Sequence, residues 1–318
     1  METFNVIIPI FVFLAGGFLC RRFKVVSLET KNFLNNLVYY AAMPAMIFKG
    51  IVSFDFQSTF RLDIVAQNLL TTLVVFLLTF GVSFLIKDPK KRGAFHMGCF
   101  RSNQGYMGLP VVDSFFGARA VSITALINGF DSPYCVILSI VALEIFRTIA
   151  YGNGNKEGAK KLLLSKLFDV IKNPFLIATV LGFICVWLKL NVLSLGFVSE
   201  LLTLTSNISM PLSLFVIGCS INFGSIRKNV GIIASVSAIK LVLAPVIGFI
   251  IGVFIFSLSG EDLAFSVLLV GMPSSVSSYA LAAQMDTDDE LMASIIGITT
   301  ALSIITIPIV YNVLKVIA

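Results

Sequence analysis

The chain has 318 residues, of which 57% are apolar and only 13% are charged, with a net charge of +6. A soluble domain of this size carries about a quarter charged residues, so most of this protein's surface must face something other than water. The basic residues lie in short clusters between apolar stretches, a pattern that excludes a nucleic-acid-binding surface and is typical of membrane proteins.

Apolar stretches long enough to cross a hydrocarbon core of about 30 Å, which takes about 20 helical residues, recur along the chain. The first has no basic residue before it and no cleavage pattern of small residues, which favours a retained helix over a signal peptide. The sequence therefore predicts an all-α membrane protein. In chain order, its ten transmembrane helices are expected over 4–20, 31–52, 64–86, 93–116, 119–143, 168–189, 194–222, 229–256, 264–284 and 290–316.

Lysine and arginine are concentrated in the first, third, fifth and seventh loops between these helices. Short loops rich in basic residues stay in the cytoplasm, so we expect both termini outside and a multi-pass protein of the cell (plasma) membrane. The longest loop, the cytoplasmic linker 147–166, divides the chain into a first half, 1–146, and a second half, 167–318, of five helices each.

The two halves resemble one another. Pro9, Gly17, Phe18, Cys20 and Lys24 match Pro174, Gly182, Phe183, Cys185 and Lys189; Met43-Pro44, Phe48 and Phe56 match Met210-Pro211, Phe215 and Phe223; Gly108-Leu109-Pro110 matches Gly271-Met272-Pro273. Because each half has an odd number of helices, the second copy must cross the membrane in the opposite sense. Inverted repeats of this kind are the usual architecture of secondary transporters, in which alternating access follows from them.

Two of the predicted helices contain a proline near glycine or serine, and these two occupy matching places in the halves. Pro110 follows Gly105 and Gly108 in the fourth, and Pro273 lies in the ninth. We expect both helices to be broken at these prolines. Interrupted helices in matching positions indicate a central binding site, and the half-helix after each break presents free N–H groups that suit an anion.

Arg101 lies inside the fourth predicted helix, where inserting an arginine into the membrane costs at least about 2.5 kcal/mol. Such a cost indicates that the residue has a functional or structural role. Its planar guanidinium suits a carboxylate. Asp131, in the fifth helix, is expected at the same depth. Two interpretations stay open: a resting Arg101–Asp131 ion pair, or Arg101 bound to substrate with Asp131 as the candidate coupling residue, because burial without a partner favours a protonated carboxyl.

Other polar residues near the two breaks carry weaker predictions. Ser102, Asn103 and Gln104 offer uncharged hydrogen bonds, either to a substrate or between helices. Ser274, Ser275, Ser277 and Ser278 either line a cavity or let helices approach closely. His96 is expected to be packed or interfacial, and Lys240 to snorkel or to meet Glu200. The five scattered cysteines, without a Cys-x-x-Cys, indicate free thiols and no metal site.

The chain resembles the auxin efflux carrier family, which includes bacterial malonate or dicarboxylate carriers. The motifs that carry the resemblance lie in order along nearly the whole chain: Arg21-Arg22, Met43-Pro44, Arg101-Ser102-Asn103 before Gly108-Leu109-Pro110, Lys172-Asn173-Pro174, Met210-Pro211, Met272-Pro273, and Ser303, Thr306 and Pro308. The linker is shorter than that of the plant carriers, so neither plant-type regulation nor an auxin substrate is expected.

The resemblance implies ten helices, of which the fourth and the ninth cross at their proline breaks, and a fold similar to bile acid sodium symporters. In that fold a scaffold of helices 1, 2, 6 and 7, often dimeric, holds a mobile transport domain of helices 3–5 and 8–10 that moves as an elevator. By motif, the substrate site maps to Arg101, Asn103, Gln104 and Pro110, with Pro273 and the serines that follow it.

The sequence thus predicts a secondary transporter of a small organic anion, a mono- or dicarboxylate, that is surrounded by lipid and binds no nucleic acid. The resemblance implies that it forms a homodimer. No cofactor is expected. H⁺ and Na⁺ are the candidate coupling ions, and uniport driven by the membrane potential stays open beside them. The sequence lacks the motifs of zinc and aspartyl intramembrane proteases, so no enzyme activity is expected. A channel, or a sensor built on a transporter fold, stays as the alternative.

Overall fold

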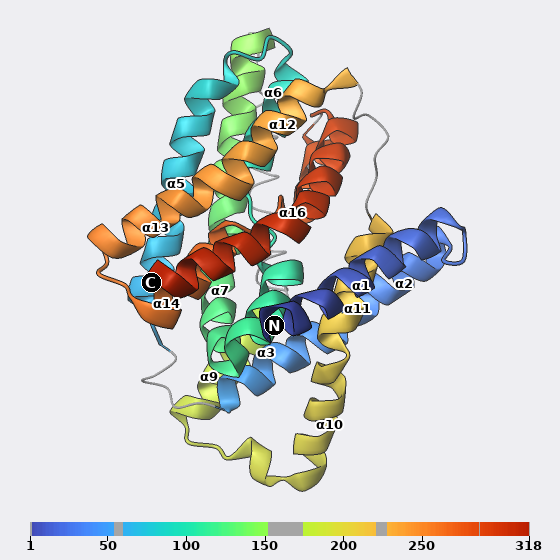
Figure 1. Cartoon of the computed structure of the whole chain (residues 1–318), viewed down its shortest axis with the longest axis vertical. Coiled ribbons are helices and arrows are strands. Elements are labelled where there is room, and N and C mark those ends of the chain that lie inside the picture. Colours follow the sequence, from blue (N-terminus) through green and yellow to red (C-terminus); the bar gives the residue numbers. More distant parts are fainter. Residues whose placement is uncertain (1, 54–59, 152–173, 221–227, 286, 318) are drawn as a thin grey trace. The chain divides into compact units, whose positions relative to one another are not determined.

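The computed structural model describes residues 2–53, 60–151, 174–220, 228–285 and 287–317 (Figure 1). Every element of this part of the chain is a helix. They are α1 (Glu2–Arg22), α2 (Leu28–Leu37), η1 (Val38–Ala42), α3 (Met43–Val52), α5 (Leu62–Ser83), α6 (Pro89–Phe100), η2 (Gln104–Gly108), α7 (Leu109–Tyr151), α9 (Pro174–Trp187), η3 (Val192–Ser194), α10 (Gly196–Asn207), α11 (Ser209–Ser220), α12 (Val230–Ala238), η5 (Ile239–Leu243), α13 (Ala244–Phe254), α14 (Gly260–Val270), α15 (Ser277–Gln284) and α16 (Asp289–Ile317).

Five helical stretches of the described residues are long and apolar enough to cross a membrane: Leu62–Ser83, Gln104–Ala150, Gly196–Cys219, Val230–Phe254 and Asp289–Ile317. The second has 47 residues, more than twice what one crossing takes. Gly117, at φ 73°, interrupts it with a kink that only glycine adopts without strain. The predicted linker 147–166 lies outside the described residues from 152 on, as do Lys172 and Asn173.

The chain divides into two compact units, each assembled from three separate parts of the sequence. The first unit comprises Met1–Val65, Gln104–Gly129 and Ile171–Ser220, and the second comprises Ala66–Asn103, Phe130–Val170 and Ile221–Ala318. Both units therefore draw on both halves of the chain, and α7 contributes its beginning to the first unit and its end to the second.

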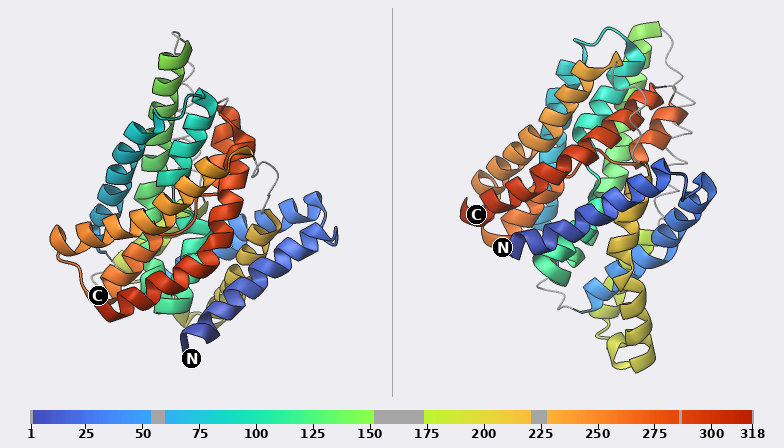
Figure 2. Two further views of the ribbon diagram at one scale, coloured as in Figure 1. Left: turned by 45° about the horizontal axis from the view of Figure 1, so that its top comes forward. Right: turned by 45° about the vertical axis from the view of Figure 1, so that its right-hand side comes forward.

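Two close helix pairs build the first unit: α1 packs on α11, and α3 packs on α9 (Figure 2). Glycines permit the approach. A Cβ at Gly17 of α1 would lie 2.0 Å from the carbonyl oxygen of Phe215, and one at Gly218 of α11 would lie 2.1 Å from that of Leu14. Small residues are the usual means by which helices pack in a membrane, where no water is present to drive apolar surfaces together.

The second unit is built around an apolar core to which α5, α6, the end of α7, α12, α13, α14, α15 and α16 contribute. In Figures 1 and 2, α5 and α6 run along the end of α7. His96 is fully buried in this core, among the rings of Phe76, Phe80 and Phe146, and its Nδ1 lies 2.9 Å from the hydroxyl of Thr79. The prediction that His96 is a packed residue is confirmed.

Three short π-helices, η1, η2 and η5, each end two residues before a proline. The prolines are Pro44, Pro110 and Pro245. Proline has no N–H and its ring collides with the carbonyl four residues earlier, so a wider turn before it relieves the clash without opening the helix.

The predicted break at Pro110 is therefore wrong in position. The chain leaves the helix at Arg101–Asn103, where Arg101 has extended backbone angles, and Pro110 lies in the first turn of α7. In the other interrupted helix the gap between α14 and α15, Gly271–Val276, contains Pro273. The matched Gly-Leu-Pro and Gly-Met-Pro motifs consequently stand at different distances from the two breaks.

Candidate functional site at the paired helix breaks

The two non-helical segments of the second unit bind one another through their backbones. The N–H of Asn103 donates to the carbonyl of Pro273 at 2.9 Å, and the N–H of Ser275 donates to the carbonyl of Arg101 at 3.0 Å. These bonds form an antiparallel bridge centred on Ser102 and Ser274. Backbone that leaves a helix at membrane depth must find partners inside the protein, and here each break satisfies the other.

Further hydrogen bonds tie Ser274 to the helices around it. Its hydroxyl donates to the carbonyl of Gly98 in α6 at 2.7 Å, and its N–H donates to the hydroxyl of Thr299 in α16 at 3.2 Å. Ser274 is fully buried. These bonds hold Ser274 to α6 and α16, so this serine anchors the bridge.

Arg101 is buried, with 6% of its surface exposed, and its guanidinium points between α7 and the second break. Nη1 donates to the hydroxyl of Ser139 at 2.9 Å and to the carbonyl of Cys135 at 3.4 Å, and Nη2 donates to the hydroxyl of Ser277 at 3.0 Å. Nε has no hydrogen-bond partner among the described residues. A buried charged donor without an acceptor is costly, so this N–H is poised for a ligand.

Asp131 is also buried and makes no ion pair with Arg101 within 4 Å: in the described part of the chain the one ion pair joins Arg61 and Asp63. The carboxylate instead accepts from the thiol of Cys135, at 3.4 Å. The predicted resting pair is thus not formed in this structure, because the guanidinium instead donates to neutral groups of Cys135 and Ser139, one and two helical turns further along α7. Arg101 and Asp131 still attract one another electrostatically.

Two more buried polar atoms at the breaks lack a partner among the described residues: Nδ2 of Asn103 and the hydroxyl of Ser278. Ser277, by contrast, is exposed, and its hydroxyl lies 2.9 Å from that of the half-buried Ser275. The second break thus has an accessible edge at Ser277 and unpaired hydrogen-bonding groups below the surface. This arrangement is suited to a small anion with several oxygen atoms.

A family model described as membrane transport protein matches residues 3–311 of the chain. The chain belongs to the auxin efflux carrier family. It is 28% identical to an uncharacterized transporter of Methanocaldococcus jannaschii over 96% of this chain and 97% of that protein. It is also 24% identical to a "Putative malonate transporter" of Rhizobium meliloti, over 96% and 94% of the two chains. These relatives are transporters, and the protein is therefore a membrane-embedded transporter.

Two residues that the carrier motifs place in the site, Gln104 and Pro110, belong to the first unit of this auxin efflux carrier. Gln104 begins η2 and is 1% exposed, and Pro110 is buried in the first turn of α7. The residues that the structure brings together within the second unit are Arg101, Ser102, Asn103, Asp131, Pro273, Ser274, Ser275 and Ser277.

Lys240 is the functional candidate that sequence reasoning missed. It does not snorkel: its side chain is 1% exposed, and its ammonium donates to Ser102 and to the carbonyl of Val270. The signal was present, because Lys240 lies in the middle of the apolar stretch 229–256 and incurs the same cost of burial that drew attention to Arg101.

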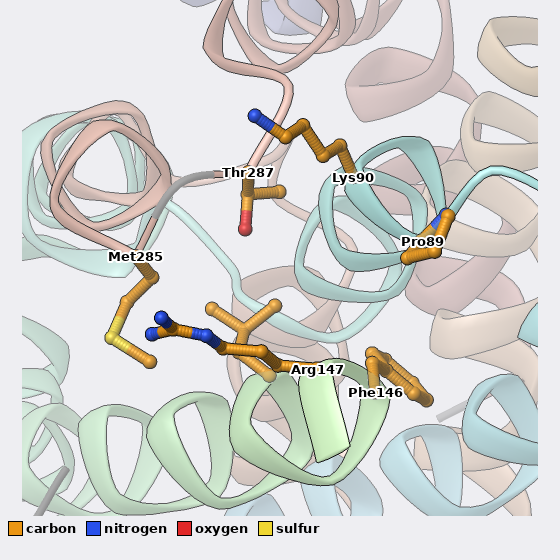
Figure 3. Close-up of a pocket in the computed structure, with 7 residues that line it drawn as sticks. Pro89, Lys90, Phe146, Arg147, Met285 and Thr287 are labelled. Atoms are coloured by element: carbon orange, nitrogen blue, oxygen red, sulfur yellow. The ribbon is translucent and has the colours of Figure 1, made fainter. Parts of the chain in front are cut away.

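Two cavities lie away from the breaks. One, of about 30 Å³ in the second unit, is lined by residues that include Lys90, Phe146, Arg147 and Thr287 (Figure 3). The other, of about 320 Å³ in the first unit, is lined by Met46, Lys49, Gly50, Ser53, Asp113, Ala118, Val121, Ser206, Asn207 and Pro211. Its charged lining is one lysine and one aspartate, so it has no excess of positive charge for an anion.

Proposed function

We propose that the protein is a secondary active transporter that moves a small organic anion, a mono- or dicarboxylate, across the cytoplasmic membrane. The observation that carries the proposal is the buried Arg101, whose Nε is unpaired beside a break that has an accessible edge at Ser277. A guanidinium offers parallel N–H donors that match a carboxylate, and a dry surrounding strengthens that attraction.

The position of Arg101 adds support, because discontinuous membrane helices are where secondary transporters bind substrate. Both breaks of the second unit contribute hydrogen-bonding groups, and α15 begins directly after the second break with its positive dipole end. The similarity to a "Putative malonate transporter" extends over nearly the whole of both chains and favours a carboxylate as the transported group.

The proposal includes ten transmembrane helices in two inverted repeats. Its support is a reciprocal packing in the first unit: α1 pairs with α11 and α9 pairs with α3, so the first helix of each half packs on the second helix of the other. The matched glycines Gly17 and Gly182 both lie at these contacts, where Cβ atoms would meet Phe215 and Ile51 at 2.0 Å and 3.0 Å. The breaks also pair across the halves.

We further propose that the protein works as an elevator, in which predicted helices 1, 2, 6 and 7 form a scaffold that dimerises and helices 3–5 and 8–10 form the mobile transport domain. The compactness of each unit by itself supports a division into two bodies. The first unit contains α1, α3, α9 and α11, which are helices 1, 2, 6 and 7 of the predicted ten, and it also contains Gln104–Gly129, which the prediction assigns to helices 4 and 5. The basic loops favour outside termini in a plasma-membrane protein.

The test is uptake of labelled mono- and dicarboxylates into proteoliposomes, with pH, sodium and voltage gradients imposed one at a time. We expect one acid or a small group of acids to saturate, and preloading with unlabelled acid to accelerate entry of the label by counterflow. A channel would give uptake that does not saturate and shows no counterflow. A sensor would bind an acid without moving it, and either result would overturn the proposal.

Asp131 is the candidate coupling residue of this mechanism. We expect Asp131→Asn to lose stimulation of uptake by an inward proton gradient while counterflow at equal pH persists, because the amide cannot take up a proton. Uptake with and without the gradient measures this, and the exposed Glu261→Gln in α14 is the control. If the variant and the wild type respond equally to the gradient, Asp131 does not couple transport to protons.

A further inference from the structure

Lys240 connects a third helix to both breaks of the second unit. It lies in the π-helix η5, between α12 and α13, and its side chain is 1% exposed. The ammonium donates to the carbonyl oxygen of Val270 at 2.9 Å and to the hydroxyl of Ser102. The hydroxyl of Ser102 in turn donates to the same carbonyl at 3.0 Å. The ammonium of Lys240 therefore contacts the first break through Ser102 and the start of the second break through Val270.

The two acceptors are of the kind that bind a metal cation in a transporter. Val270 is the last residue of α14, so its carbonyl lies at the negative end of a half-helix, and Ser102 is in the unwound segment opposite. Carbonyl oxygens at the ends of interrupted helices coordinate Na⁺ in secondary transporters. In this protein, the position beside these oxygens is filled by an ammonium group of the chain itself.

The surroundings hold the ammonium in this place. A buried lysine destabilises the fold unless it is hydrogen-bonded or paired, and here Asp131 adds an electrostatic attraction to the two hydrogen bonds. The π-turn at Ile239–Leu243 precedes Pro245, whose ring lies 3.4 Å from the Cβ position of Gly271. Helix α13 is thus packed against the beginning of the second break, which fixes the base of the lysine side chain.

We propose that the ammonium of Lys240 is a built-in cation that joins the two breaks, and that transport consequently does not require Na⁺. The inference rests on the proposed transport function and deepens it, because it selects among the coupling ions. Lys240 acts as a positioning residue: it bonds Ser102, the neighbour of Arg101, and no substrate contact is assigned to it.

The first measurement replaces Na⁺ by choline on both sides of the proteoliposome membrane at constant pH and voltage. We expect wild-type uptake of the transported acid to be equal in the two salts. Uptake that needs Na⁺ would overturn the inference. If no acid moves in either salt, the proposed function fails, and melting of the detergent-solubilised protein still decides the role of Lys240: the wild-type Tm should be equal in NaCl and in choline chloride.

Lys240→Met removes the charge and keeps the length of the side chain. The variant should fold, because the hydroxyl of Ser102 and the carbonyl of Val270 keep their own hydrogen bond. We expect uptake to fall about tenfold or more, the loss that corresponds to one hydrogen bond to a charged group. The exposed Lys228→Met in the same unit should transport like the wild type. Unchanged uptake in Lys240→Met would contradict the inference.

Lys240→Ala supplies a readout that a merely structural role would not change. The truncation leaves the oxygens of Ser102 and Val270 beside an open space, so a small cation should replace the lost ammonium. We expect propylammonium or Na⁺, but not choline, to raise both the Tm and the uptake of Lys240→Ala while leaving the wild type unchanged. A variant that responds equally to all three cations would rule out a cation site at this point.

Discussion

Arg101→Lys is expected to reduce uptake of the transported acid by roughly 100-fold, from the loss of one to two hydrogen bonds to a charged group at about 1.5–3 kcal/mol each. The two terminal nitrogens of the guanidinium donate hydrogen bonds to Ser139, Cys135 and Ser277, and the Nε–H remains available to a carboxylate. A lysine has a single nitrogen that cannot occupy these separate positions and also bind a carboxylate. Initial rates in proteoliposomes and equilibrium binding of the labelled acid measure the effect.

The matched control is Arg147→Lys, which makes the same exchange at an exposed arginine near the end of α7. It should bind and transport as the wild type does. Size-exclusion profiles of both variants show whether the folded protein is retained. If Arg101→Lys binds the acid and transports it at the wild-type rate, the carboxylate does not bind at the breaks, and the site must be sought in another part of the protein.

Gly17→Ala and Gly218→Ala are each expected to destabilise the protein by about 3 kcal/mol, at the upper end of the usual cost of overpacking. Their new Cβ atoms would lie 2.0 Å from the carbonyl oxygen of Phe215 and 2.1 Å from that of Leu14. A backbone carbonyl inside a helix cannot turn aside, so α1 and α11 must separate along their contact. Thermal unfolding in detergent, followed by the loss of monodisperse protein on size exclusion, measures the change.

Gly16→Ala is the control for this pair, because it makes the same exchange one residue earlier in α1, where nothing lies within 4 Å of the new Cβ. Alanine favours a helix over glycine by up to about 1 kcal/mol, so this variant should melt at or slightly above the wild-type temperature. Equal melting of Gly16→Ala and Gly17→Ala would show that the two helices are not in close contact in the membrane protein.

The sequence was most informative about features that depend only on the length of an apolar stretch or on the energetic cost of burying a charge. Apolar stretches predicted the long helices, and the expense of a buried charge identified Arg101 before any partner was known. Pro110 was misleading because a proline disturbs only its own turn: a π-helix before it absorbs the clash, and α7 continues. The break at Arg101–Asn103 contains no proline, and extended backbone becomes favourable there through hydrogen bonds to Pro273 and Ser275.

The partners of the charged residues could not be predicted from the sequence either, because they also depend on contacts between segments far apart in the chain. Depth along a helix places Arg101 and Asp131 at one level, but the choice between a direct pair and bonds to Ser139 and Cys135 depends on the rotation of α7. Lys240 and Ser102 are 138 residues apart in the sequence, and no local sequence pattern predicts a contact between them.

The pairing of the two breaks also has a consequence for biosynthesis. Asn103 and Arg101 find their backbone partners in Pro273 and Ser275, which the ribosome adds about 170 residues later. Until then the nascent chain holds an unsatisfied stretch of backbone and a guanidinium that still lacks its partner Ser277, both of which hydrocarbon disfavours. The early helices of the second unit therefore complete their fold only after the insertion machinery has released the last ones, and a chain truncated before α14 should be a substrate for membrane quality control.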